Sequence, residues 1–135
     1  MTDNKNRILI IDPDTQVIRQ YQTCFSQYQC EIEICRSITE AVEKIRNIFF
    51  PCVIMDVDLP DMKGYEAIPI LKALEPKIQI IMTAAENTIE LETHIRKQDV
   101  SYYYIKSFDI DELHLAVESV FRKGTNRCCS NFKCV

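Results

Sequence analysis

The chain has 135 residues, of which 47% are hydrophobic and 27% are charged, and its formal net charge is −4. This length fits one domain with a substantial core, and the composition excludes a disordered chain. The mild acidity disfavours broad electrostatic binding to nucleic acid or anionic membranes. No apolar run approaches the ~20 residues that span a bilayer, and the first residues do not resemble a signal peptide, so we expect a cytoplasmic protein.

The seven cysteines do not predict a disulfide framework, because their number is odd and no export signal precedes them. We expect four of them, which lie in or beside apolar segments, to be small buried residues: Cys24, Cys30, Cys35 and Cys52. The other three fall short of the four ligands of an ordinary structural zinc site: Cys128, Cys129 and Cys134. The periodic pattern stops past Gly124, so we expect one domain over residues 1–124 and an irregular tail over 125–135.

The first strand and helix are predicted from a change in hydrophobic spacing. Residues 7–12 read RILIID, a short apolar run rich in β-branched residues that suits a buried parallel strand. A helix is predicted from Pro13, a residue that suits a first helical turn. Its apolar positions are three or four residues apart: Val17, Tyr21, Phe25 and Tyr28.

The next strand and helix follow the same pattern. Residues 31–35 (EIEIC) alternate and predict a second strand. Ser37 with Glu40 resembles a capping box at the start of a helix, which Pro51 ends. The apolar face of this helix is predicted to comprise Ile38, Ala41, Val42, Ile45 and Phe49.

The third strand leads into a polar loop and another helix. Residues 52–55 (CVIM) predict a buried strand that Asp56 closes, and DVDLPDMKG reads as a loop. The helix that follows has Ile68, Leu71 and Leu74 on its apolar side. We expect Pro69 to lie near the start of this helix and to delay its first regular turn.

Five strands and five helices are predicted in all. Residues 78–82 and 102–105 give the fourth and fifth strands, residues 86–97 a weakly amphipathic helix, and residues 109–122 the last helix. Regular alternation of this kind predicts an α/β fold, in which helices cover both faces of a parallel sheet.

Polar residues end the buried strands. Asp12 ends the first, with Asp14 two residues on, Asp56 ends the third, Thr83 the fourth and Lys106 the fifth. In doubly wound sheets the ligand site lies outside the carboxyl ends of the strands, so these side chains are expected at one edge. Clustered carboxylates favour a divalent cation, and a lysine and a hydroxyl can bind phosphoryl oxygens. The set suits phosphoryl transfer to a carboxylate, in which positioning and charge stabilisation dominate.

Four segments, ILIID, VIMDVDLPDMKGYE, IIMTA and YYYIKSF, resemble the signature stretches of response-regulator receiver domains, in the right order. The resemblance covers about residues 7–122. It implies a (βα)5 flavodoxin-like fold, a doubly wound five-stranded parallel sheet with strand order 2-1-3-4-5. It also implies a two-component signalling domain rather than an enzyme, one that at most catalyses its own phosphorylation.

The resemblance assigns roles to the acidic residues. Asp56 matches the phosphoacceptor. Asp12 matches the first of the family's paired acids, which helps to hold Mg²⁺ together with the acceptor, and Asp58 matches the position whose main-chain carbonyl binds the metal. Asp14 is a further candidate for a metal ligand.

The resemblance also assigns a switch. Thr83 matches the switch hydroxyl and Lys106 the lysine of the family motif, and both count with Asp56 as catalytic. Ala84 matches the small neighbour that keeps phosphate access open. Tyr103 matches the aromatic residue whose ring turns inward when the hydroxyl moves. The expected partners are a sensor histidine kinase or phosphotransfer protein, and a downstream protein on the face of the fourth helix, fifth strand and fifth helix, with no direct nucleic acid and no membrane.

Two residues depart from the family pattern. The second of the paired acids, normally a direct metal ligand, is Pro13 here, which predicts weak Mg²⁺ binding. The proline that usually follows the lysine, often through a cis bond, is Ser107, which favours a trans bond.

Several alternatives stay open. Plain structural roles exist for Asp12 as a helix cap, Lys106 as a surface lysine and Tyr103 as strand packing. Pro13 supports a degenerate receiver that acts as a phosphorylation-independent interaction module. The Asp12-Pro13-Asp14 run also resembles haloacid-dehalogenase-like phosphatases, although Gln16 departs from that motif. A flavin binder is disfavoured because the chain has only two glycines. The sequence names no output, so a stand-alone receiver and a piece of a longer regulator both fit.

Overall fold

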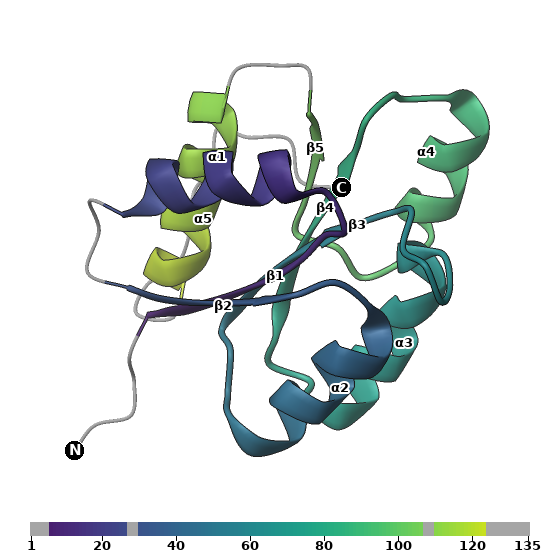
Figure 1. Cartoon of the computed structure of the whole chain (residues 1–135). Helices are drawn as coiled ribbons and strands as arrows, with labels where there is room; N and C mark the ends of the chain where they lie inside the picture. Colours follow the sequence, from purple (N-terminus) through teal and green to yellow (C-terminus); the bar gives the residue numbers. More distant parts are fainter. Residues whose placement is uncertain (1–5, 27–29, 107–109, 124–135) are drawn as a thin grey trace.

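The computed structural model of the chain describes residues 6–26, 30–106 and 110–123 (Figure 1). Within them strands and helices alternate: β1 (Arg7–Ile11), α1 (Thr15–Phe25), β2 (Glu31–Cys35), α2 (Ile38–Asn47), β3 (Cys52–Asp56), α3 (Gly64–Leu74), β4 (Gln79–Ala84), α4 (Ile89–Arg96), β5 (Tyr102–Ile105) and α5 (Ile110–Lys123). All neighbouring strands pair in parallel in the order β2-β1-β3-β4-β5. The predicted fold class and strand order are therefore confirmed.

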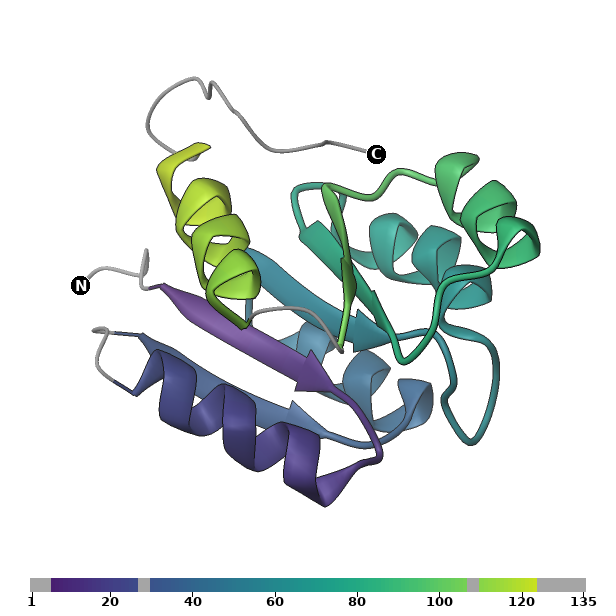
Figure 2. The same cartoon turned by 90° about the horizontal axis from the view of Figure 1, so that it is seen from above.

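The helices cover the sheet from two sides, α1 and α5 on one face and α2, α3 and α4 on the other (Figures 1 and 2). Successive side chains of a strand point to opposite faces. In β4, for example, Ile80 and Met82 pack with α2 and α3, whereas Ile81 packs with α1 and α5. The sheet therefore separates two hydrophobic clusters, each built from alternate residues of the same strands.

Helix α1 begins two residues later than predicted. Asp14 is its N-cap, and Asp14 Oδ1 accepts hydrogen bonds from the amides of Gln16 and Val17 at 2.9 and 3.4 Å. Pro13 therefore precedes the cap instead of occupying the first turn. The alternative in which Asp12 caps this helix is wrong for the same reason, because the capping position is already filled.

Helix α3 corrects the expectation for Pro69. The helix begins at Gly64, so Pro69 lies inside it rather than near a delayed start. Since the first four amides of a helix have no intrahelical partner, a proline at the sixth position removes only one early hydrogen bond.

Helix α2 also differs at its end. It stops at Asn47, and Ile48 is already extended, so Phe49 lies outside the helix and is 40% exposed. Phe50 is buried in its place, because the chain runs extended into Pro51. Among the four cysteines of the described ranges, Cys35 and Cys52 are buried as predicted, whereas Cys24 and Cys30 are only half-buried.

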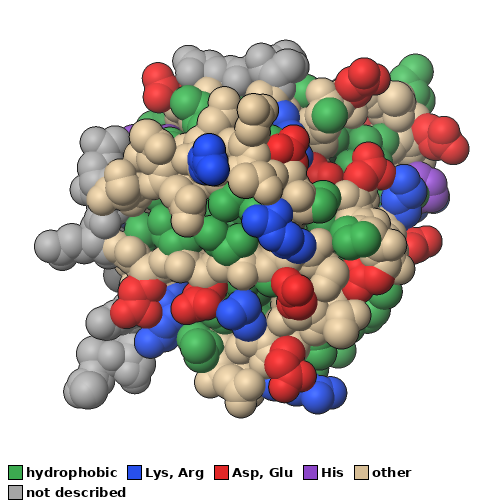
Figure 3. All heavy atoms as spheres, in the orientation of Figure 1, with side chains coloured by type: hydrophobic (Ala, Val, Ile, Leu, Met, Phe, Trp, Pro, Cys, Tyr) green, Lys and Arg blue, Asp and Glu red, His purple; other side chains and the backbone are tan. Residues whose placement is uncertain are grey.

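Three predictions fall on residues outside the described ranges: Tyr28 on the first helix face, Ser107 after the lysine, and the tail with its three cysteines. In the part of the chain that the structure covers, no helix is long and apolar enough to cross a membrane. Acidic and basic side chains are interspersed on the face shown in Figure 3.

Candidate functional site

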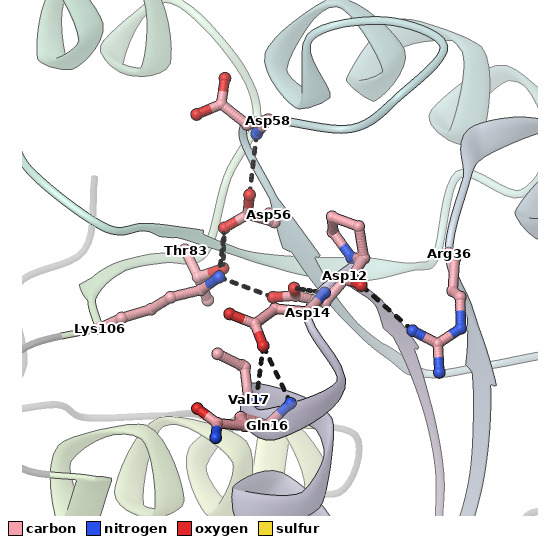
Figure 4. A network of polar contacts seen from close by, with 10 residues as sticks. Asp12, Asp14, Gln16, Val17, Arg36, Asp56, Asp58, Thr83 and Lys106 are labelled. Atoms are coloured by element: carbon pink, nitrogen blue, oxygen red, sulfur yellow. Dashed lines mark hydrogen bonds and ion pairs between the residues drawn. The ribbon is translucent and has the colours of Figure 1, made fainter.

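The polar strand ends meet at the carboxyl edge of the sheet (Figure 4). Asp12 directly follows β1, Asp56 is the last residue of β3 and pairs in register with Thr83 of β4, and Lys106 directly follows β5. By strand alternation these side chains belong to the α1/α5 face, because Ile10, Ile54 and Ile81, each two residues earlier, pack there. The topology thus brings together the four residues that the sequence singled out at strand ends.

Lys106 links the two acids. Its Nζ lies 2.8 Å from Asp12 Oδ2 and 2.8 Å from Asp56 Oδ1. The hydroxyl of Thr83 donates to the same Asp56 oxygen at 3.2 Å. Asp12 is 1% exposed, Asp56 6%, and the Lys106 side chain 17%. Lys106 is therefore an ion-paired residue of a largely buried site and not a surface lysine.

The main chain fixes the other carboxylate oxygens. The amide of Asp14 donates to Asp12 Oδ1 at 2.9 Å, and the amide of Asp58 donates to Asp56 Oδ2 at 2.9 Å. Each bond spans two residues, the pattern by which an aspartate side chain holds the turn that follows it. Both carboxylates are thus oriented by the loops that begin at their own strands.

Burial and charge oppose each other in this cluster. Burial raises the pKa of Asp12 above its ordinary value, and its contacts with Lys106 only partly offset that effect. Burial disfavours the charge of Lys106, but its hydrogen bonds with Asp12 and Asp56 outweigh this and raise the pKa of Lys106. Lys106 therefore carries its positive charge at neutral pH and is available to an incoming anion.

The oxygen donors for a metal are few. Asp14 uses Oδ1 as a helix cap, and the carbonyl of Pro13 accepts a hydrogen bond from Arg36 at 3.1 Å. No group of three or more His, Cys, Asp or Glu side chains in the described ranges is arranged to hold a metal ion. Asp12 and Asp56 remain, and Mg²⁺ is commonly bound through one or two carboxylates, waters and phosphate oxygens. The donor set therefore fits Mg²⁺ in kind, with fewer protein ligands than three carboxylates would give.

The remaining predicted residues lie around this cluster. The hydroxyl of Tyr103 donates to Asn87 Oδ1 at 2.9 Å, which ties β5 to the loop before α4. Ala84 is buried on the opposite face of the sheet from Thr83. It lines a groove of about 570 Å³ beside Asp58 and the start of α4. The side chain of Asp58 forms an ion pair with Lys63 at 2.6 Å.

Sequence reasoning missed three residues near the site. Arg36, directly after β2, bonds the Pro13 carbonyl, Lys63 pairs with Asp58, and the buried hydroxyl of Tyr21 lies on the α1/α5 face. Only Tyr21 carried a signal, namely a phenol at a core position of the helix that follows the first acid.

The chain matches the family model described as response regulator receiver domain over residues 8–118. It is 30% identical over 113 residues to Regulatory protein AtoC of Escherichia coli (strain K12). The matched region covers 84% of this chain and 24% of AtoC. The chain is 27% identical over 118 residues to Transcriptional regulatory protein ZraR of the same strain, covering 87% and 27%. The chain thus spans about a quarter of the length of these curated relatives.

Among solved structures, the crystal structure of a response regulator receiver domain protein (CheY-like) from Methanospirillum hungatei JF-1 superposes with a TM-score of 0.81 and 26% sequence identity. The match covers 89% of this chain and 96% of that one. The family model, the relatives and the structural superposition agree, and the chain belongs to the receiver domain family of two-component response regulators.

Proposed function

We propose that Asp56 accepts a phosphoryl group and that Lys106 and Thr83 assist the transfer. The observation that carries this proposal is the convergence of Lys106 Nζ and Thr83 Oγ1 on one oxygen of Asp56, at 2.8 and 3.2 Å. A cation and a hydroxyl donor beside a carboxylate are the groups that bind phosphoryl oxygens as they arrive. Asp12 keeps Lys106 in place from the other side.

The transfer needs no covalent chemistry beyond the carboxylate itself. An oxygen of Asp56 forms a bond to phosphorus, the bond from phosphorus to the donor breaks, and the donor atom keeps that electron pair. The donor is the phosphohistidine of a sensor kinase or phosphotransfer protein, or a small acyl phosphate. The Lys106 ammonium redirects part of its hydrogen bonding from the two carboxylates to the phosphoryl oxygens. The Thr83 hydroxyl turns its hydrogen toward the same group.

Asp12, Asp56 and the main-chain carbonyl of Asp58 would hold Mg²⁺, with Asp14 as a further candidate. The ion, when bound, neutralises charge on the phosphoryl oxygens. Its affinity is lower than three carboxylates would give, because Pro13 contributes no side-chain oxygen and Asp14 is engaged as a helix cap. The residues of this chain orient the acceptor whether or not the ion is present, through the Asp58 amide and Lys106.

We further propose that Thr83 and Tyr103 pass the change to the surface of α4, β5 and α5. A phosphoryl group adds ~1.5–2 negative charges at this edge and draws the Thr83 hydroxyl inward. Tyr103 then leaves Asn87 and turns into the space, while Ala84 leaves room for the phosphoryl group beside Asp58. Helix α4 has one buried residue, Ile95, so it is held by few contacts and can shift at low cost. A downstream protein docks on this surface.

A second candidate is a degenerate receiver that docks partners without phosphorylation. The position of Pro13 and the capping role of Asp14 favour it, because they remove two oxygen donors from the edge where a metal would bind. The phosphatase alternative is disfavoured, since it needs Asp14 as acid and base, whereas Asp14 caps α1.

Intact mass after incubation with acetyl phosphate and Mg²⁺ tests the first proposal. We expect one added phosphoryl group on the unchanged chain and none on Asp56→Asn. Asp58→Asn is the matched control, because it removes a neighbouring carboxylate and keeps the main-chain carbonyl. Modification that persists in Asp56→Asn, or an unchanged mass in the parent chain, contradicts the assignment, and the second result favours the degenerate module.

Amide hydrogen exchange with and without beryllofluoride tests the switch. Protection should change within residues 83–106, and Thr83→Ala should remove most of that change. An identical exchange pattern with beryllofluoride bound would mean that Thr83 and Tyr103 do not transmit the signal.

A further inference from the structure

Tyr21 is a buried tyrosine that the proposed chemistry does not use. It lies on α1, is 1% exposed, and packs in the hydrophobic cluster of the α1/α5 face. Among the described residues its hydroxyl has no hydrogen-bond partner. A buried donor without a partner is uncommon in native proteins and calls for an explanation, so the surroundings of this hydroxyl matter.

Tyr21 packs on the same face of the sheet as the polar strand ends. Asp12, Asp56 and Thr83 belong by strand alternation to the face that α1 covers, and Thr83 pairs in register with Tyr104, which packs in the same cluster as Tyr21. Burial chiefly raises the pKa of Tyr21, and the charge of Asp12 raises it further. The Thr83 hydroxyl lowers that pKa, although the two hydroxyls do not reach hydrogen-bond geometry.

Thr83 is the natural acceptor for this donor. A hydroxyl donates one hydrogen bond and can accept others, and Thr83 spends its hydrogen on Asp56 Oδ1. At 3.2 Å that bond is longer than the usual range of about 2.5–3.0 Å between hydroxyl and acceptor oxygens. The Thr83 side chain lies, by strand alternation, on the side of the sheet where Tyr21 is buried.

We propose that Tyr21 is a positioning residue for the phosphorylated state, an inference that rests on the function proposed above. When the Thr83 hydroxyl donates to a phosphoryl oxygen on Asp56, the Tyr21 hydroxyl donates to Thr83 Oγ1 and holds it in that position. Two hydrogen bonds then follow one another, from Tyr21 to Thr83 and from Thr83 to the phosphoryl group, and each polarises the other.

The consequence is a difference between the two states. The hydroxyl of Tyr21 is unsatisfied in the unmodified protein and satisfied in the phosphorylated one. A contact made in only one of two states shifts the balance toward that state. Tyr21 therefore favours phosphoryl retention at the expense of the resting form.

Beryllofluoride affinity, measured by calorimetric titration in the presence of Mg²⁺, tests the proposal. Tyr21→Phe should weaken beryllofluoride binding by about three- to tenfold, the effect of one net hydrogen bond. Urea unfolding of the unliganded variant should show no loss of stability, because the removed hydroxyl had no partner there. A purely structural tyrosine would give the reverse pattern, lower stability with unchanged affinity.

Tyr102→Phe is the matched control, since Tyr102 is a buried tyrosine whose hydroxyl already bonds Ser119 at 2.7 Å. This variant should lose stability and bind beryllofluoride like the parent chain. In a Thr83→Ala background, Tyr21→Phe should have no further effect on affinity, because the acceptor is gone. An undiminished effect in that background overturns the assignment of Thr83 as the acceptor.

Measurements on the parent chain distinguish a failure of this inference from a failure of the phosphoacceptor proposal. Normal beryllofluoride binding by both the parent chain and Tyr21→Phe overturns the role of Tyr21 and leaves the phosphoacceptor proposal standing. Failure of the parent chain to bind beryllofluoride overturns the phosphoacceptor proposal and this inference with it.

Discussion

The two faces of the sheet are built from the same strands and differ in what they bury. The face under α2, α3 and α4 buries only hydrophobic side chains from the strands, such as Ile11, Met55 and Met82. The face under α1 and α5 buries hydrophobic side chains along most of each strand and polar ones at the carboxyl end, namely Asp12, Asp56 and Thr83. The buried polar side chains at the strand ends thus gather at one end of one face.

The difference follows from strand alternation. Ile11 and Asp12 are neighbours in sequence, yet they point to opposite faces, and the same holds for Met55 and Asp56. A shift of one residue in register would exchange the two sets and bury the acids among hydrophobic side chains. The fully apolar face therefore fixes the register on which the polar site depends, and it also supplies stability that the buried charges do not.

The largest effect on stability is expected in the hydrophobic cluster under α2, α3 and α4. Ile80→Ala should lower the free energy of unfolding by about 2–5 kcal/mol, because it removes a fully buried side chain and leaves a cavity. Phosphorylation of the remaining folded protein should stay near that of the parent chain, since Ile80 lies on the face away from Asp56.

Ile81→Ala is the matched comparison on the other face. Ile81 is equally buried, so its loss of stability should be similar, but it lies two residues before Thr83 on the same side, and phosphoryl uptake should slow. Urea unfolding and intact-mass time courses measure the two quantities. Equal slowing in both variants would mean that the two faces are not functionally separate.

A smaller loss is expected where α3 begins against β3. A Cβ added at Gly64 would collide with the backbone carbonyl of Asp56 and crowd the end of the Met82 side chain. Gly64→Ala should lower the free energy of unfolding by about 1–3 kcal/mol through overpacking. Adding Met82→Ala should not restore the loss, because the closest obstacle is backbone. Recovery in the double variant would show that Met82 is the cause.

The sequence predicted the polar edge because each residue there ends a hydrophobic run. The order of the strands then followed from alternation and from the family resemblance. Asp14 was harder to place, since Pro13 and Asp14 both suit a helix start, and only the structure shows that the cap goes to Asp14. Phe49 and Phe50 are indistinguishable by hydrophobicity, and the extended backbone before Pro51 decides between them.

Specific side-chain contacts outside this edge could not be predicted. Arg36 with Pro13, and Tyr103 with Asn87, join segments whose separation in sequence carries no periodic signal. The buried hydroxyl of Tyr21 is of the same kind, because a phenol on a helix face looks like ordinary core until its neighbours are known.

The next smaller effect is expected at Pro13 and concerns the affinity for Mg²⁺. Pro13→Asp should tighten Mg²⁺ binding by about tenfold, or about 1.4 kcal/mol, because it adds a carboxylate beside Asp12. Calorimetric titration measures the change. Pro13→Ala is the matched control, since it removes the ring without adding an oxygen, and it should bind Mg²⁺ as the parent chain does. Equal tightening in both variants would assign the effect to loop flexibility.

The smallest effect concerns the charge of Asp12, and it depends on pH. Because burial raises the pKa of Asp12 above 3.8, the folded protein holds this proton more tightly than the unfolded chain does. The stability that the protonated form contributes is present below pH 3.8 and is lost as the pH rises through the folded-state pKa. The side chain at position 12 of Asp12→Asn does not titrate. The free energy of unfolding of the parent chain should therefore fall relative to that of Asp12→Asn as the pH rises.

We therefore expect the difference in the free energy of unfolding to shift in favour of Asp12→Asn as the pH rises from about 4 to about 8. Urea unfolding of both proteins across this range measures the difference, and titratable groups remote from Asp12 contribute equally to both. The opposite trend, with the parent chain gaining on Asp12→Asn as the pH rises, would mean that the ion pair with Lys106 outweighs burial. In that case the polar end of the α1/α5 face would stabilise the fold instead of depending on the apolar face for stability.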